Sequence, residues 1–318
     1  MPRLHLIGCL VAAAMLTAPV ESRAQETLKL AVGQRSLWDT SVSELGQRAG
    51  IFKKHGLNLE ILYTQGAGET QQAVIAGSVD VGVGAGVMGV LSAYSKGAPV
   101  RIIGAEITGA GDLFWYVKAD SPIKSINEVG EGKTIAYSTN GSSTHGVVTA
   151  FIKQHDLKAK PIATGGPPAT LTAVMSDQID VGWSAPPVGL DLLDQGRIRM
   201  LATGNDTLFK DQVVRLLISN VQVLQSRKAA VDRYVKAYRE TVDWMYSDPS
   251  ALKVYADFAG ISEAMGKRIR DTFFPKQALS PDDLIGLDVI LKDAVVLKFT
   301  ASELTKAQLT DLIQIPPR

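Results

Sequence analysis

Short apolar segments alternate with helical patterns from residue 28 to residue 202. Leu28 to Gly33 and Leu57 to Tyr63 are apolar runs that predict strands, and the amphipathic stretch Trp38 to Ala49 between them predicts a helix. Helices and strands that alternate at short spacing indicate an α/β fold with a mainly parallel sheet covered on both faces. Further strands are predicted at 79–83, 100–107, 134–137, 179–183 and 198–202, and further helices at 69–76, 145–155 and 169–176.

Beyond Ser226 the pattern is helical up to the C-terminus. Ala229 to Tyr246 predicts a long helix, because its apolar side chains recur at helical spacing and share one face. Ser280 followed by Pro281 predicts the start of another helix, since proline fits the first helical turn. The residues on the predicted apolar face are Val231, Tyr234, Val235, Tyr238, Val242 and Met245.

One sequence motif occurs twice in the chain. Ala73 to Val83 and Ala173 to Trp183 share the pattern A-V-[IM]-x-x-x-[IV]-D-V-G. Their separation exceeds the period of about 20–50 residues found in solenoid repeats, so the repeat indicates two similar lobes. Ligands of open α/β sheets bind at the carboxyl ends of the strands, which predicts a binding cleft between the lobes. Asp80 and Asp180 occupy equivalent positions in this motif. They are interpreted as residues that accept hydrogen bonds from the backbone in turns, not as a catalytic dyad.

Two apolar stretches, Leu113 to Lys118 and Val214 to Ser219, are interpreted as the crossings between the lobes. A helical tail that follows the second crossing should pack back on the first lobe. The first lobe is then discontinuous, and the two crossing strands form a hinge. The resulting division is a leader at 1–24, the first part of lobe 1 at 25–117, lobe 2 at 118–218 and a helical return to lobe 1 at 219–318.

The first 24 residues resemble a cleaved secretory signal. Arg3 precedes the apolar run Leu4 to Ala18, and Ser22-Arg23-Ala24 is a small-x-small cleavage site. The run is shorter than the roughly 20 residues that span a membrane. The single cysteine, Cys9, lies inside the leader, so the mature chain should hold no disulfide and no cysteine metal site. Lipidation of Cys9 is the open alternative.

Net charge excludes one class of partner. The whole chain carries +1, and the leader holds two arginines and one glutamate, so the mature chain is neutral. Nucleic-acid binding proteins need a basic stripe or patch, and none is evident here.

Three short motifs together resemble a known family. These are Gly50-Ile51-Phe52 with the following His55-Gly56-Leu57, the turn Gly77-Ser78-Val79-Asp80-Val81, and Gly141-Ser142-Ser143-Thr144-His145 at the start of a helix. With the leader, they resemble the substrate-binding proteins of ABC importers, in the group for nitrate, alkanesulfonates, taurine and thiamine-pyrimidine precursors.

The resemblance implies a two-lobed periplasmic binding protein fold, type II-like, with two hinge strands. It also implies a monomer without cofactor that closes on a small-molecule ligand in the periplasm. The partners would be an ABC permease and its ATPase. A bilobed receptor that reports a ligand to a signalling partner is the alternative.

The candidate ligand-binding residues lie at strand ends and at one helix start. Small hydroxyl residues before a helix leave backbone N–H groups free for an anion, and an arginine fork binds a carboxylate or sulfonate. Tryptophans can form aromatic walls, and a buried glutamate could accept an amino group. The same residues could instead be an ordinary helix cap, a solvated arginine and core tryptophans. The candidates are Arg35, Ser36, Trp38, Gln65, Gly84, Ala85, Glu106, Ser142, Ser143, Thr144, His145, Trp183 and Ser184.

Enzyme classes are weakly supported by the sequence. Gly84 to Gly89 fits G-x-G-x-x-G, but it follows the third predicted strand and not the first of a unit, which argues against a dinucleotide-binding oxidoreductase. Gly182 to Pro186 lacks the second glycine of G-x-S-x-G, and no H-E-x-x-H occurs. The family relatives that make a pyrimidine precursor need a cysteine-rich segment, and the mature chain should contain no cysteine. We therefore expect a binding protein that is not an enzyme and holds no metal.

Overall fold

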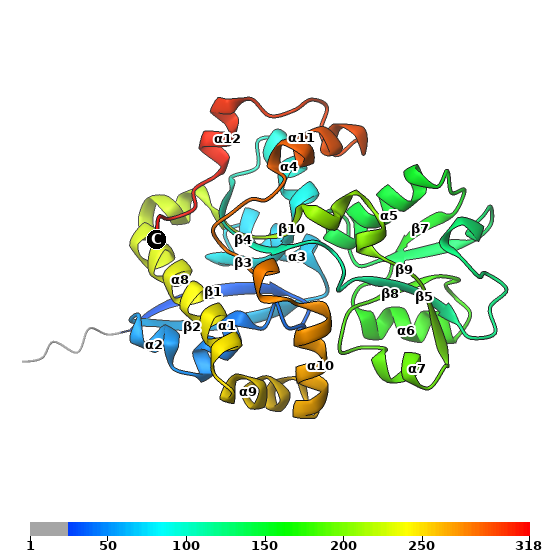
Figure 1. Ribbon diagram of the computed structural model, residues 1–318. Helices are drawn as coiled ribbons and strands as arrows, with labels where there is room; N and C mark the ends of the chain where they lie inside the picture. Colours follow the sequence, from blue (N-terminus) through cyan, green and yellow to red (C-terminus); the bar gives the residue numbers. More distant parts are fainter. Residues whose placement is uncertain (1–24) are drawn as a thin grey trace, which may run out of the picture.

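The computed structural model describes residues 25–318. The predicted leader and Cys9 lie outside the described residues. Two α/β lobes lie side by side, and Figure 1 shows them with β1–β4, β10 and the C-terminal helices on one side and β5–β9 with α5–α7 on the other.

The sheet of lobe 1 has five strands in the order β2-β1-β3-β10-β4. β1 is parallel to β2 and β3, whereas β10 runs antiparallel between β3 and β4. The predicted mainly parallel sheet is therefore found, with one strand inserted in the opposite direction. The strands are β1 (Glu26–Gly33), β2 (Leu57–Thr64), β3 (Val81–Gly86), β4 (Val100–Thr108) and β10 (Val213–Asn220).

Lobe 2 repeats this order. β5 pairs antiparallel with β8 and β9, β6 pairs parallel with β7, and a parallel bridge between Ile135 and Val181 joins the two parts. The order β7-β6-β8-β5-β9 thus matches β2-β1-β3-β10-β4, with the antiparallel strand in the same place. The strands are β5 (Phe114–Lys118), β6 (Thr134–Tyr137), β7 (Lys160–Ala163), β8 (Gly182–Ser184) and β9 (Ile198–Thr203).

The crossings differ in detail from the prediction. The stretches 113–118 and 214–219 are mostly strand, as β5 and β10, and lie within the sheets of the two lobes. The chain passes between the lobes just before each of them, at 109–113 and 204–212. The apolar stretches correspond to buried strands, since every residue of β10 is buried. The connections between the lobes contain polar turns, so an apolar pattern does not reveal them.

The C-terminal helices cover lobe 1. The predicted apolar face of α8 is buried as expected, and Tyr234 stacks on Phe52 of α2 with ring centroids 5.5 Å apart. Within residues 25–318, no helix combines the length and apolar character needed to cross a membrane. The helices are α1 (Val42–Arg48), α2 (Ile51–Lys54), α3 (Ala67–Ile75), α4 (Val87–Ser95), α5 (Ser143–Gln154), α6 (Pro167–Met175), α7 (Leu190–Asp194), α8 (Val221–Ser247), α9 (Ser250–Ala259), α10 (Glu263–Phe273), α11 (Leu287–Val296) and α12 (Lys306–Leu312), with 3-10 turns η1 (Ile126–Glu128), η2 (Gly204–Asp206), η3 (Leu208–Asp211) and η4 (Lys276–Ala278).

The helix predicted to start at Ser280 is wrong. The segment from Pro281 to Ile285 is not helical, and α11 begins only at Leu287. The carbonyl of Pro281 accepts a hydrogen bond from Ala105 N at 3.0 Å, and that of Ile285 accepts one from Val213 N at 2.9 Å. These bonds to strand residues compete with helix formation and hold the segment along the sheet.

The repeated aspartates bond the backbone of their own lobes, as predicted. Asp80 Oδ2 accepts from Lys29 N at 2.8 Å, and Asp180 Oδ2 accepts from Thr134 N at 2.9 Å. Each bond ties the turn before one strand to the neighbouring strand. The two carboxylates occupy equivalent places in two lobes and do not form a catalytic dyad.

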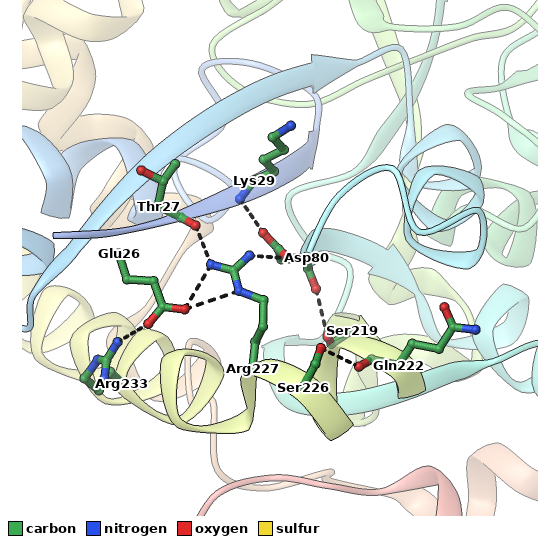
Figure 2. Close-up of polar contacts among 9 residues, drawn as sticks. All are labelled: Glu26, Thr27, Lys29, Asp80, Ser219, Gln222, Ser226, Arg227 and Arg233. Atoms are coloured by element: carbon green, nitrogen blue, oxygen red, sulfur yellow. Dashed lines mark hydrogen bonds and ion pairs between the residues drawn. The ribbon is translucent and has the colours of Figure 1, made fainter. Parts of the chain in front are cut away.

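Arg227 links the aspartate of lobe 1 to the C-terminal helices (Figure 2). Its Nη1 lies 2.7 Å from Asp80 Oδ1, and its Nη2 donates to the Thr27 carbonyl and to Glu26. Arg227 has φ −134° and ψ 24°, so α8 is kinked at this residue. The guanidinium contacts the first residues of β1, and this joins the helical return to the first strand.

We predict that Arg227→Ala lowers the free energy of unfolding by about 1.5–3 kcal/mol, as expected for lost hydrogen bonds between charged groups. Urea denaturation measures the change. The matched control is Lys228→Ala, which removes an exposed i,i+4 pair with Asp232 at 2.8 Å and should cost at most about 0.5 kcal/mol. Equal effects of the two variants would show that the Arg227 contacts contribute nothing beyond surface charge.

Candidate functional site

A small cavity lies between the lobes. It offers about 20 Å³ to a water-sized group, little more than the roughly 10–15 Å³ that one water needs. Its walls come from the ends of β1 and β3 and from β10 in lobe 1, from the start of α5 and β8 in lobe 2, and from the first crossing. The lining residues are Gly33, Gln34, Leu37, Thr40, Ala67, Gly84, Leu113, Ser138, Ser142, Ser143, Thr144, Trp183 and Arg215.

Two helix N-termini face this cavity, one from each lobe. α3 contributes Ala67, its first residue, and α5 contributes Ser143 and Thr144. The N-terminus of a helix carries roughly half a positive charge and unpaired N–H groups. The two helices therefore favour an anion from opposite sides of the cleft.

Hydroxyl groups order the start of α5. Ser142 caps the helix, and its Oγ accepts from His145 N at 3.1 Å. Thr144 Oγ1 lies 2.9 Å from both Ser138 Oγ and Ser142 Oγ. These contacts fix the turn before the helix and place three hydroxyls on the cavity wall. The sequence prediction of a capped helix start at this position is correct.

Arg215 is the charged residue of the lining, and the sequence analysis missed it. It sits on β10 and is 4% exposed. Its Nη2 donates to Asp112 Oδ2 at 2.7 Å, and its Nε lies 2.9 Å from Asp39 Oδ2. A single charged residue inside the apolar run Val213 to Ile218 was the available signal, because arginine is rarely buried without a partner.

Glu106 belongs to the same buried cluster. Its Oε2 accepts from Gly84 N at 2.5 Å, and it is 1% exposed. Burial raises the pKa of Glu106 well above its usual range, and the charge of Asp39 adds to this, whereas Arg215 lowers it. Glu106 therefore bonds the backbone of β3, and it is not part of the cavity lining, contrary to the expected contact with a ligand amine.

The pKa of Asp112 is raised as well. Burial raises its pKa to about 6, although the neighbouring Arg215 opposes the shift. Asp39 and Asp112 both pair with the guanidinium of Arg215. Because two carboxylates face one guanidinium, the cluster adds no net positive charge to the cavity, and the helix ends are the source of positive potential there.

Five of the predicted ligand residues lie in the lining: Gly84, Ser142, Ser143, Thr144 and Trp183. Trp183 is 1% exposed, and its Nε1 donates to the Gly165 carbonyl at 3.2 Å. The structure thus brings β3, the start of α5 and β8 together at one cavity; the repeat predicted that the two strands would meet at a cleft.

Arg35, Ser36 and Trp38 turn away from the cavity, although Leu37 between them belongs to the lining. The guanidinium of Arg35 lies 4.8 Å from the ring centroid of Phe258 on α9. The carbonyl of Ser36 accepts from Tyr255 OH, and the buried Trp38 donates to Tyr246 OH, both at 2.9 Å. This loop serves the packing of α8 and α9 on lobe 1, so Arg35, Ser36 and Trp38 do not join the lining.

His145 also points elsewhere. Its Nδ1 accepts from Gly141 N at 3.1 Å, and its ring stacks on Tyr137 at 4.7 Å. Phe299, after α11, meets the ring edge-on at 5.3 Å. Burial lowers the pKa of His145, which keeps the imidazole neutral at neutral pH. The residue contacts the C-terminal segment and not the cavity.

Three further predicted residues lie beside the lining without joining it. Gln65 is exposed at the rim, where its carbonyl accepts from Gln34 Nε2 at 2.5 Å. Ala85 is buried in β3 opposite Leu216. Ser184 is buried and donates to the Val188 carbonyl at 2.8 Å. Among residues 25–318 no group of three or more His, Cys, Asp or Glu side chains is arranged to hold a metal ion.

The chain is distantly similar in sequence to enzymes. A 4-amino-5-hydroxymethyl-2-methylpyrimidine phosphate synthase of Saccharomyces cerevisiae is 22% identical over 232 residues, which are 67% of this chain and 66% of the yeast protein. The chain thus spans about two thirds of the length of this relative. The name contradicts the expectation that the chain is not an enzyme. The lack of cysteine expected for the mature chain argued only against cysteine chemistry, and one fold can host both binding and catalysis.

Solved structures share the fold. The alkanesulfonate-binding protein SsuA of Xanthomonas axonopodis pv. citri bound to MOPS has a TM-score of 0.73 at 16% identity, covering 91% of this chain and 98% of that one. The nitrate-binding protein NrtA of Synechocystis PCC 6803 has a TM-score of 0.71 at 14% identity, covering 91% and 86%. The expected two-lobed periplasmic binding protein fold is confirmed.

The model of the family described as "NMT1/THI5 like" matches residues 45–252, which is more than half of the chain. This match contains β2, β3 and the start of α5, where the sequence motifs and the cavity wall lie. The chain belongs to the NMT1/THI5-like family.

Proposed function

We propose that this protein captures a small organic anion, a carboxylate or a sulfonate, between its lobes and delivers it to an ABC permease. The observation that carries the proposal is the interlobe cavity, at which the N-termini of α3 and α5 face each other beside Arg215. A ligand held there would contact both lobes at once. Binding to both lobes favours the closed arrangement by the difference in affinity between the open and closed states.

The donors of the site suit an oxyanion. Backbone N–H groups at a helix start bind carboxylate, sulfonate or phosphate oxygens. The hydroxyls of Ser138, Ser143 and Thr144 and the wall formed by Leu37 and Trp183 complete a pocket that is part polar and part apolar. This combination suits a charged head attached to a small apolar body better than an inorganic ion alone.

Transport rests on the solved relatives, two of which are named for binding alkanesulfonate and nitrate. The leader predicted at 1–24 would place the mature protein in the periplasm, where it would meet a permease driven by an ATPase. A receptor that reports the anion to a signalling partner is the alternative. Deleting the gene should reduce uptake of the labelled anion if the protein serves transport, and uptake should be unchanged if it serves signalling.

The activity of the yeast relatives is a second candidate, and the family match favours it. The test is growth of a strain that lacks its own pyrimidine phosphate synthase and expresses residues 25–318. Growth without added pyrimidine precursor would support synthesis. Growth only when the precursor is supplied would leave binding as the better account.

We predict that Ser143→Asp abolishes anion binding while the protein stays folded. The new carboxylate stands at the first residue of α5, where a negative charge favours the helix. About 5 Å from a bound anion, at an effective dielectric constant near 20, it would repel the anion by about 3 kcal/mol. Titration calorimetry with acetate and methanesulfonate measures the affinity, and the melting temperature reports folding.

Ser143→Ala is the matched control for this variant. It removes one hydroxyl and adds no charge, so affinity should fall by about 1 kcal/mol or less. If Ser143→Asp binds the anion as well as the unmodified protein does, the ligand does not lie at the start of α5, and the proposed site is wrong.

We predict that affinity for methanesulfonate rises as the pH falls from about 7.5 to about 5. Asp112 has a raised pKa of about 6, so it is ionised above this pH and offsets Arg215, and it is protonated below it. Loss of that negative charge leaves Arg215 less neutralised beside the cavity. One linked proton can change the affinity by up to about tenfold per pH unit.

Asp112→Asn should bind methanesulfonate with an affinity that changes little over the same range. The exposed Asp120→Asn serves as control and should behave like the unmodified protein. Calorimetry at four pH values distinguishes the variants, and methanesulfonate itself stays ionised throughout. An unmodified protein whose affinity does not change with pH would show that the Arg215 cluster does not sense the ligand.

A further inference from the structure

Four glycines of lobe 1 face a single turn of lobe 2. Gly66 and Gly68 stand at the start of α3, and Gly86 and Gly89 stand at the start of α4. The turn at 138–143 precedes α5 and carries its cap. Gly68 N donates to Thr139 Oγ1 of this turn at 2.9 Å. We call these four residues the glycine face.

The glycine face leaves no room for side chains. A Cβ atom on Gly86 would lie 2.5 Å from the Gly141 carbonyl oxygen. Added carbons on Gly68 and Gly89 would come still closer to the carbonyl oxygens of Asn140 and Gly141, well inside the 3.0 Å limit below which Cβ atoms are essentially never found. Because the nearest obstructing atoms at Gly68, Gly86 and Gly89 are backbone, a rotamer change cannot relieve the overlap there, whereas a carbon on Gly66 would meet the side chain of Thr139.

Backbone conformation does not explain these glycines. Gly86 has φ −68°, and Gly66 has the extended value 165°, both open to other residues. Gly68 and Gly89 lie within helices, where glycine is less stable than alanine. The contact with lobe 2 is thus the physical reason for glycine here. It also accounts for Gly86 and Gly89 of the G-x-G-x-x-G pattern, which meet protein backbone and not a phosphate.

The glycine face adjoins the cavity. Ala67 and Gly84 lie next to it in the chain, and Ser142 and Ser143 end the turn that it contacts; all four belong to the lining. The distance between the two backbones therefore controls the space left between the lobes, about 20 Å³ at the contact seen here.

We propose that the glycine face selects the ligand by size. By letting the two backbones approach closely, it keeps the space between the lobes small, so that closure favours an anion with a few heavy atoms, of the class of acetate or methanesulfonate. A longer or aromatic anion would hold the lobes apart and forfeit the contacts with one helix end. This inference rests on the proposed binding of an anion between the lobes.

The test uses Gly89→Ala, with Gly130→Ala as control. Alanine favours the helix at position 89, so α4 should stay folded. At Gly130 the nearest atom to an added carbon is 4.0 Å away, so nothing obstructs it. Calorimetry measures the affinity for acetate, methanesulfonate and MOPS, the last as a bulky sulfonate. Small-angle scattering measures compaction at saturating ligand.

We expect the unmodified protein and Gly130→Ala to bind acetate or methanesulfonate and to become more compact. They should bind MOPS at least tenfold more weakly and without compaction. Gly89→Ala should lose at least tenfold in affinity for the small anion, should not compact, and should prefer the small anion over MOPS less strongly. An unchanged melting temperature of Gly89→Ala would show that the loss does not come from unfolding.

Two results would overturn the size selection while leaving the proposed function standing. One is equal affinity of Gly89→Ala and the unmodified protein for the small anion. The other is compaction of the unmodified protein around MOPS as complete as around acetate. If the unmodified protein binds none of the three anions, the proposed function fails and the size selection fails with it.

Discussion

The buried ion pairs of Arg215 join three segments beside the cavity. Arg215 stands just after the second crossing, Asp112 lies in the first crossing, and Asp39 comes from the loop that follows β1. Removing one partner of a buried pair costs about 3–5 kcal/mol, because the other charge is left uncompensated. Relative motion of the lobes should therefore pivot around this cluster. The cavity wall that carries Arg215 then stays fixed to lobe 1 while lobe 2 moves.

Local patterns predicted most of the elements, because the burial of a strand or helix face shows in a few successive residues. The strand at 134–137 was placed correctly, and the aspartate turns follow from a repeat that is visible in the chain. β7 was missed because Lys160 and Pro161 are exposed and give it no apolar run. The helix expected at Ser280 does not form, because backbone N–H groups of β4 and β10, distant in sequence, donate hydrogen bonds to the carbonyls of this segment.

Prediction of the site failed where distant segments decide the direction of a side chain. Ser142 to Thr144 and Trp183 could be found, since a helix cap and a strand end have fixed places in an α/β lobe. Trp38 packs on Tyr246 and Tyr255, about two hundred residues later, and His145 packs on Phe299. Periodicity shows that such residues are apolar or polar, but not which helix will cover them.

The distribution of charge explains how a neutral protein can favour an anion. Asp39 and Asp112 offset Arg215, so a long-range attraction from net charge is absent. What remains are two helix ends, and these act only over the first turn. One of them belongs to lobe 1 and the other to lobe 2. An anion in the open form would meet one helix end and gain the second only on closure. In the proposed function, the short range of the helix ends would therefore couple ligand binding to closure, and the glycine face would limit how far the lobes close.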